Sequence, residues 1–293
     1  MPTTPLPAAL FDVRIADAVL EWAGVILIGV FAIGLTISGR WGRTLRLPRV
    51  GGESLRGLDV AICLYGMFFF PVVLNTLLPG SVEPTATTGP ATDALQSHRQ
   101  AWVAVLGQAA TAVFLVWMGR RRMGFTARKW GIRADRLPRD LAVAMLGYVA
   151  IWPVCAGLLD VSIAALRWGF PDYPLRQHDA IKTLISEDFL TLTGGLTLLS
   201  AVALAPFVEE MLFRGILQRA LAQWSRSQWA AVVVSGVAFG CIHYPYIQTV
   251  PALACFGIVL GFAYARTRSL PLVVAMHAIF NAKTVLWVAL GRT

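Results

Sequence analysis

Long apolar runs alternate with short polar connections along the whole chain. A helix needs roughly 20 predominantly apolar residues to cross a bilayer, and about eight runs approach that length. None of them shows the two-residue alternation that is typical of a half-buried strand. The pattern predicts an all-α, polytopic integral membrane protein with about eight transmembrane helices, at residues 17–38, 58–78, 101–118, 141–165, 192–212, 229–246, 250–265 and 271–290.

The composition supports this membrane assignment. Of the 293 residues, 57% are hydrophobic, only 14% are charged, and the mean hydropathy is +0.65. Such values exclude an ordinary soluble domain of this length. No internal repeat is visible, so we expect one continuous membrane domain. Residues 1–190 contain N-terminal transmembrane helices and loops with few candidate catalytic residues, whereas residues 191–293 contain nearly all of these candidates.

The charged residues predict the orientation in the membrane. Residues 40–56 contain five arginines against one Glu, and residues 119–139 contain eight basic residues against one Asp. Such loops stay on the cytoplasmic side, so we expect a multi-pass protein of the cell membrane with its N-terminus outside. The loops 79–100 and 167–190 then face outward. The formal net charge of +9 reflects this topology, and we predict no nucleic-acid partner.

A pair of carboxylates lies inside one of the predicted spans. Glu209 and Glu210 are the only acidic residues in the last 105 positions, and an ionisable residue within a membrane helix suggests a functional site. Glu210 and Arg214 are one helical turn apart and can pair, so we expect them to support the structure. Glu209 is rotated by about 100° from Glu210, which leaves its carboxylate for chemistry.

Two histidines lie in other predicted spans, His243 in 229–246 and His277 in 271–290. On a helix, His243 shares a face with Phe239, which can buttress its imidazole, and the adjacent Gly240 permits close approach of another helix. His277 shares a face with Asn281, so these two side chains should converge on one point. The remaining histidines, His98 and His178, lie in polar loops, and we expect them on solvated surfaces outside the site.

Three motifs occur in order on successive apolar segments: Glu-Glu-x-x-x-Arg, Phe-x-x-x-His and His-x-x-x-Asn. Their order and spacing over residues 195–285 resemble the CPBP (CAAX protease/bacteriocin-processing, Abi) family of intramembrane proteases, which includes CAAX prenyl endopeptidases. The resemblance implies that residues 191–293 form a catalytic helical core with an intramembrane cavity. Since water must reach a buried site, we expect this cavity to open to the cytoplasmic side.

The resemblance also implies roles for individual residues. Glu209 would act with His243 to activate a water molecule for attack on a peptide carbonyl. His277 and Asn281 would stabilise the developing oxyanion or help to position the water. Together these four are the predicted catalytic residues, whereas the Glu210 and Arg214 pair would support the structure.

The sequence leaves metal dependence open. The family is commonly described as metalloprotease-like, and Glu209, His243 and His277 can supply the three protein ligands of a divalent metal such as zinc. Asn281 is a poor zinc ligand, however, and the chain contains no His-Glu-x-x-His motif.

The predicted function is that of an intramembrane endopeptidase. It would hydrolyse a peptide bond of a membrane-associated peptide or protein, prenylated or not, with the lipid bilayer as its other partner. Two alternatives use the same residue types: a proton-coupled transporter, and a non-proteolytic membrane scaffold or immunity factor. A transporter needs a pathway to both faces, whereas the polar groups here gather at one inferred depth. A silent scaffold should lack part of the motif set, and no motif position is missing.

Overall fold

The computed structural model describes residues 13–40, 45–47, 55–78, 90–186 and 190–289. Within these ranges the chain is almost entirely helical and contains no strand, which confirms the predicted all-α fold. The main helices are α1 (Val13–Ser38), α3 (Gly57–Leu77), α4 (Pro90–Arg121), α5 (Leu137–Gly169), α6 (Asp179–Ser186), α7 (Leu192–Leu199), α8 (Ala205–Glu210), α9 (Gln218–Ser225), α10 (Gln228–Cys241), α11 (Val250–Thr267) and α12 (Leu270–Ala289).

The structure contains seven helical segments that are long and apolar enough to cross a membrane, within the described residues. They span residues 17–38, 57–77, 94–121, 134–169, 192–225, 244–267 and 270–287. Seven of the eight predicted spans correspond to them, so the chain is a polytopic membrane protein. The exception is the predicted span 229–246, because α10 has only 14 residues. Its length is about 21 Å, whereas the hydrocarbon core of a bilayer is about 30 Å thick.

Proline explains why α10 ends early. Pro245 has no amide hydrogen, and it disfavours helical backbone at the residue before it. The α-helix ends at Cys241, and a 3-10 segment, η4 (Tyr244–Thr249), connects it to α11. His243 therefore leaves the helix on which the sequence placed it and lies in the turn between α10 and η4.

The helix that carries the two glutamates is irregular on both sides of them. Between residues 192 and 225, α7, α8 and α9 are joined by two π-helical segments, η2 (Ser200–Leu204) and η3 (Met211–Leu217). Pro206, at the start of α8, cannot donate a backbone hydrogen bond. Short π-helical segments are frequent at functional sites because they change the direction of the side chains that follow.

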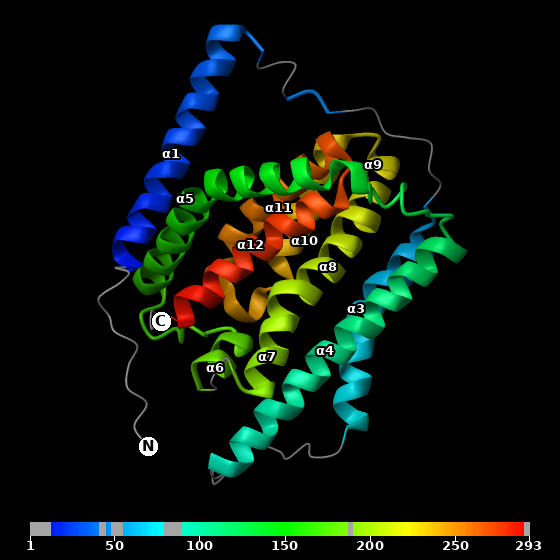
Figure 1. Ribbon diagram of the computed structural model, residues 1–293, viewed down its shortest axis with the longest axis vertical. Coiled ribbons are helices and arrows are strands. Elements are labelled where there is room, and N and C mark those ends of the chain that lie inside the picture. The colour runs from blue at the N-terminus through cyan, green and yellow to red at the C-terminus, as the bar shows by residue number, and fades with distance from the viewer. Residues whose placement is uncertain (1–12, 41–44, 48–54, 79–89, 187–189, 290–293) are drawn as a thin grey trace.

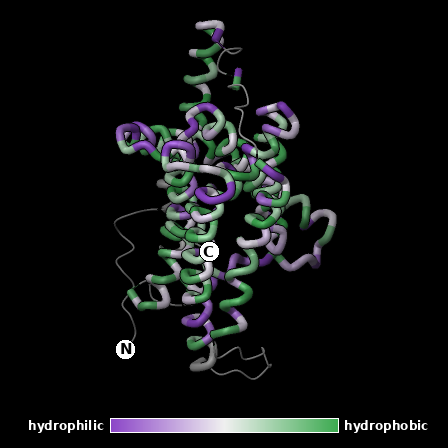
Figure 2. The backbone as a smooth tube through the Cα atoms, turned by 90° about the vertical axis from the view of Figure 1, so that its right-hand side faces the viewer, coloured by the Kyte–Doolittle hydropathy of each residue, from purple (hydrophilic) through white to green (hydrophobic). Residues whose placement is uncertain are grey.

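The core of the bundle forms where the second half of the chain packs against α5. Figure 1 shows α8, α10, α11 and α12 grouped beside α5, with α1 on one flank and α3 with α4 on another. The flanking helices expose apolar side chains, among them Ile37, Val72 and Val113. Hydrophobic stretches recur on the outer helices in Figure 2. A large exposed apolar surface of this kind suits a lipid environment.

Glycines allow α10 and α11 to pack closely. A Cβ atom at Gly240 would lie 2.7 Å from the backbone nitrogen of Ala254, and one at Gly236 would lie 2.5 Å from that of Ile258. Both distances are shorter than real Cβ contacts, so only glycine fits at these two positions. The close approach predicted at Gly240 is confirmed, with α11 as the neighbouring helix.

We expect Gly240→Ala to destabilise the protein. The new methyl group would press against the backbone of α11, and overpacking of this kind costs about 1–3 kcal/mol. The measurement is the thermal unfolding temperature of the purified protein in detergent. Gly157→Ala is the matched control because no atom lies within 4 Å of a Cβ at that helical position. Equal melting temperatures for the two variants would contradict the close packing.

Candidate active site

The two glutamates at the end of α8 have different surroundings. The Glu210 side chain is completely buried, and its Oε2 atom lies 3.1 Å from Nε of the equally buried Arg214. This is the ion pair predicted from their spacing. Glu209 keeps 19% of its side chain exposed, and its Oε2 atom has no hydrogen-bond partner among the described residues. Glu209 therefore has no hydrogen bond of the kind that holds Glu210, and the imidazole of His277 lies 3.9 Å from its Oε2 atom.

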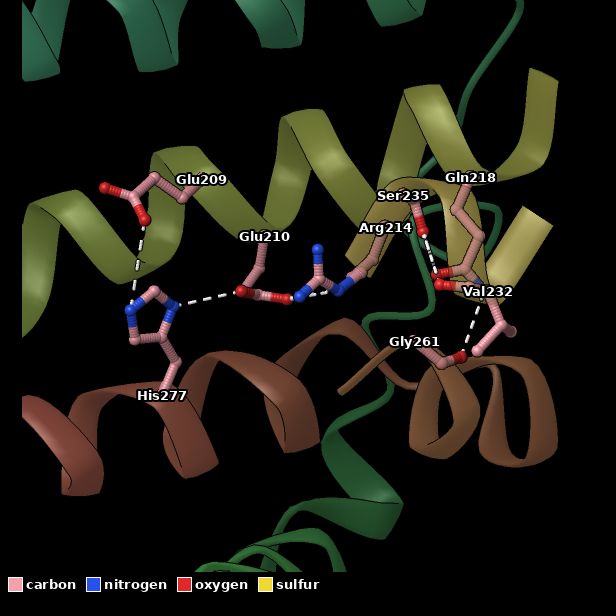
Figure 3. A network of polar contacts seen from close by, with 8 residues as sticks. All are labelled: Glu209, Glu210, Arg214, Gln218, Val232, Ser235, Gly261 and His277. Atoms are coloured by element: carbon pink, nitrogen blue, oxygen red, sulfur yellow. Dashed lines mark hydrogen bonds and ion pairs between the residues drawn. The ribbon is translucent and has the colours of Figure 1, made fainter. Parts of the chain in front are cut away.

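His277 of α12 lies between the two carboxylates, as Figure 3 shows. Its Nδ1 atom is 2.9 Å from Glu210 Oε1, and its Nε2 atom is 3.9 Å from Glu209 Oε2. Because Glu210 also pairs with Arg214, it is an ionised acceptor, and His277 Nδ1–H donates to it. In the neutral ring, Nε2 then carries no proton and faces Glu209. The contact between His277 and Glu210 was not predicted, because it joins residues that are 67 positions apart.

His243 has the same tautomer for a different reason. Its Nδ1 atom lies 2.9 Å from the backbone oxygen of Phe239. A carbonyl oxygen can only accept, so Nδ1 carries the hydrogen and Nε2 is free of it. The centroids of the two rings are 5.2 Å apart, which confirms that Phe239 supports this imidazole. Backbone and ring contacts together fix its orientation.

Phe239 supports more than one member of the site. Its ring lies edge-on to His277 at 5.4 Å, and the guanidinium carbon of Arg214 is 5.0 Å from its centroid. The side chain is fully buried. Phe239 therefore packs against Arg214 of the ion pair and against both histidines, and so supports all three side chains.

Asn281 is one helical turn beyond His277, and both side chains line the same cavity, as predicted. The Nδ2 atom of Asn281 donates to the backbone oxygen of Ala201 at 2.8 Å. Ala201 belongs to η2, so the amide stabilises the irregular helix just before the glutamates. An amide nitrogen has two hydrogens, and the second remains for another acceptor.

A cavity of about 520 Å³ brings the predicted catalytic residues together. Glu209, His243, His277 and Asn281 all line it. Most of the remaining lining is apolar and comes from α5, α6, α11 and α12. A concave, mostly apolar cavity with a few polar groups is typical of small-molecule and peptide sites.

Part of the cavity lining comes from a loop that was not expected at the site. The lining includes residues of η4 and residues 176–178, which belong to the loop that the charge pattern assigns to the outer side. Gln248 of η4 donates to the backbone oxygen of Arg176, so this loop packs against η4. Glu210, Arg214 and Phe213 are fully buried. The orientation in the membrane stays a prediction, and so does the expected opening to the cytoplasmic side.

His178 is exposed, as predicted, but it also lines this cavity, so its predicted place outside the site is wrong. Its ring, exposed on one side, packs against Tyr246 of η4 with 4.7 Å between centroids. Removal from water lowers the pKa of His178, and the nearby His243 lowers it further. His178 is therefore neutral at neutral pH and forms part of the rim without adding charge.

Gln108 is a wall residue that the motifs did not reveal. It lies on α4, lines the cavity, and accepts a hydrogen bond of 3.1 Å from Ser200 Oγ through its Oε1 atom. A single glutamine inside the apolar run 101–118 is itself unusual in a membrane helix. This isolated glutamine could have indicated from the sequence that α4 contributes to the site.

The metal prediction remains untested. In the part of the chain that the structure describes, no group of three or more His, Cys, Asp or Glu side chains is arranged to hold a metal ion. Glu209, His243 and His277 line one cavity but do not form such a group.

These observations define a class of protein: a polytopic helical membrane protein in which carboxylate, imidazole and amide side chains share one intramembrane cavity. Residues 192–283 match the family model of Rce1-like type II CAAX prenyl endopeptidases. This segment contains all four predicted catalytic residues. The match agrees with the resemblance seen in the motifs over this segment, which is the part of the chain that is similar to these proteases. Comparisons with curated proteins and with solved structures found no match.

Proposed function

We propose that this protein is an intramembrane endopeptidase that hydrolyses a peptide bond of a membrane-associated peptide or protein. One observation carries the proposal. Glu209, His243 and His277 line one cavity, and the Nδ1 atom of each imidazole is already engaged by a hydrogen bond. The family match supports the same activity.

In the proposed reaction, a water molecule binds between the Glu209 carboxylate and the Nε2 atom of His243. Glu209 accepts a proton as the water oxygen attacks the peptide carbonyl carbon, and it later passes that proton to the leaving amine. His277 can only accept through Nε2, so it positions the water, which is one of the two roles predicted for it. Its bond to Glu210 holds the ring in this orientation.

The developing oxyanion needs donors that are already in place. Asn281 can supply one, because its Nδ2 atom keeps a second hydrogen beside the hydrogen bond to Ala201. The amide nitrogen of Gln108 can supply another, since the Oε1 atom already accepts from Ser200. Both residues line the cavity from opposite parts of the sequence.

The shape of the cavity favours a hydrolase over a transporter. A transporter must connect its site to both membrane faces in turn. Here Glu210 and Arg214 are fully buried beside Phe213 and fill the bundle at one end of the cavity. We propose that substrates enter from the side of α6 or from the surrounding lipid, and that the apolar walls bind the residues next to the scissile bond.

The test is cleavage of a library of membrane peptides by the purified protein in detergent. The library contains each peptide with and without a prenyl group, and every reaction is run with and without a chelator. Cleavage that requires Glu209 supports the proposal. A preference for one peptide of each pair shows whether the prenyl group is recognised. Loss of cleavage in the presence of the chelator establishes metal dependence. Absence of cleavage throughout, with a folded protein, would contradict the proposal.

A further inference from the structure

A second cavity lies at the opposite end of the bundle from α6. It has a volume of about 290 Å³ and includes residues of α9, which Figure 1 places far from α6. Its lining contains four cationic side chains and three glutamines, and no carboxylate among the described residues. The cations are Arg128, Lys129, Arg219 and Arg268. This composition suits a negatively charged ligand.

The cavity lies where the candidate membrane spans end. Arg128 and Lys129 lie in the connection between α4 and α5, and Arg268 lies between α11 and α12. The span 192–225 ends with α9, which supplies the remaining wall. Residues from two connections and from α9 therefore meet at one boundary of the apolar bundle, at the level expected for lipid headgroups.

The backbone that presents these cations is firmly held. Trp130 is buried and packs against Phe125 with 5.0 Å between ring centroids. Gly131 has a positive φ of 85° and lies so close to the carbonyl of Arg268 that a Cβ atom would collide with it. The amide of Arg268 donates to Tyr264 at 2.8 Å and ends α11. The two connections are therefore packed against each other before any ligand binds.

Three of the cations have no internal partner. Within the described ranges, no hydrogen bond or ion pair engages the side chains of Arg128, Lys129 or Arg268. Elsewhere on the same side, Arg122 pairs with Asp59 at 3.1 Å. The side chains of Arg128, Lys129 and Arg268 therefore remain available for an external anion.

We propose that this cavity binds a phosphate group carried by an anionic ligand at the membrane surface. Arginine forms paired hydrogen bonds with phosphate oxygens, and basic pockets between transmembrane helices bind lipid headgroups. The volume lies at the lower end of the range for ligand pockets, roughly 300–1,000 Å³. Two sources share this chemistry: an anionic phospholipid of the adjoining leaflet and a soluble phosphate compound.

Gln218 connects the cavity to the interior of the bundle. Its Nε2 atom donates to the backbone oxygen of Gly261 at 2.9 Å, and it follows Arg214 by one helical turn. A ligand at the cavity would join α9 to both connections that present the cations. Because a ligand stabilises the state that binds it, we expect binding to raise the melting temperature.

The experiment compares two lipids that differ only in phosphate: short-chain phosphatidic acid and the diacylglycerol with the same chains. Binding to the full-length protein in uncharged detergent is measured by titration and by the shift in melting temperature. The cavity variant is Arg128→Gln/Lys129→Gln/Arg268→Gln. Its control, Arg120→Gln/Arg121→Gln/Arg139→Gln, removes the same charge from exposed residues outside the cavity.

We expect wild type to bind phosphatidic acid but not diacylglycerol, and the cavity variant to bind at least about tenfold more weakly. The control should stay within about threefold of wild type. Competition by inorganic phosphate would identify a soluble source, and its failure to compete would identify the lipid. Equal losses in the two triple variants, or no preference for phosphatidic acid, would overturn the proposal. If the cavity variant aggregates, the single variant Lys129→Gln is compared with its control Arg121→Gln in the same assay.

Discussion

Glu209→Gln should reduce kcat/KM for peptide cleavage by about 10²–10⁴-fold, the usual contribution of a general base. The amide has the same shape as the carboxylate but cannot accept the proton of the attacking water. The fold should survive, because Glu209 Oε2 has no hydrogen-bond partner among the described residues. The measurement is steady-state cleavage of whichever peptide the wild-type protein cuts, together with the melting temperature.

Glu21→Gln is the matched control for this loss. Glu21 is exposed on α1, away from the cavity lining, so the same chemical change should leave both cleavage and stability unchanged. Undiminished turnover of the Glu209→Gln protein would defeat the proposed mechanism. A parallel fall in melting temperature would instead assign Glu209 a structural role.

Local spacing predicted the parts of the site that depend on one helix. Glu210 and Arg214 are one turn apart, so their ion pair follows from helix geometry. The contact between Phe239 and His243 follows from the same spacing, although α10 has already ended at His243. In each pair the local spacing alone brings the two side chains together.

Contacts between distant helices could not be predicted in this way. The bond from His277 to Glu210 depends on how α12 packs against α8, and apolar faces alone do not determine that orientation. The same holds for the bond from Asn281 to Ala201, since the π-helical segment η2 has no clear sequence signal. These contacts give His277 and Asn281 different hydrogen-bond partners, which the spacing of the two residues on one helix does not reveal.

Part of the cavity lining was missed because of one short helix. Treating residues 229–246 as a full span gave α10 the length of its neighbours, whereas Pro245 favours an earlier end. After the end of α10, η4 packs against residues 176–178, which the sequence assigned to a solvated loop and which line the cavity. Pro245, two residues after His243, was the available signal for this change.

Arg214→Ala should greatly reduce the yield of folded protein. Glu210 and Arg214 are both completely buried, and removal of one partner leaves a buried charge, which costs about 3–5 kcal/mol. That is a large part of the total stability of a typical protein. The measurement is the fraction of monodisperse protein in size-exclusion chromatography after extraction in mild detergent. Arg133→Ala, which breaks an exposed pair with Asp135, should cost about 0–1 kcal/mol and leave the yield unchanged.

A double variant separates the structural role of the pair from its effect on chemistry. In Glu210→Gln/Arg214→Leu no charge remains buried without a partner, so the folded yield should recover relative to Arg214→Ala. Activity should stay low, because a neutral amide no longer fixes the Nδ1–H of His277 and the ring can adopt the other tautomer. Recovery of both yield and full activity would show that the pair only stabilises the fold. A double variant with the same low yield as Arg214→Ala would show instead that the buried charge is not the cause of the instability.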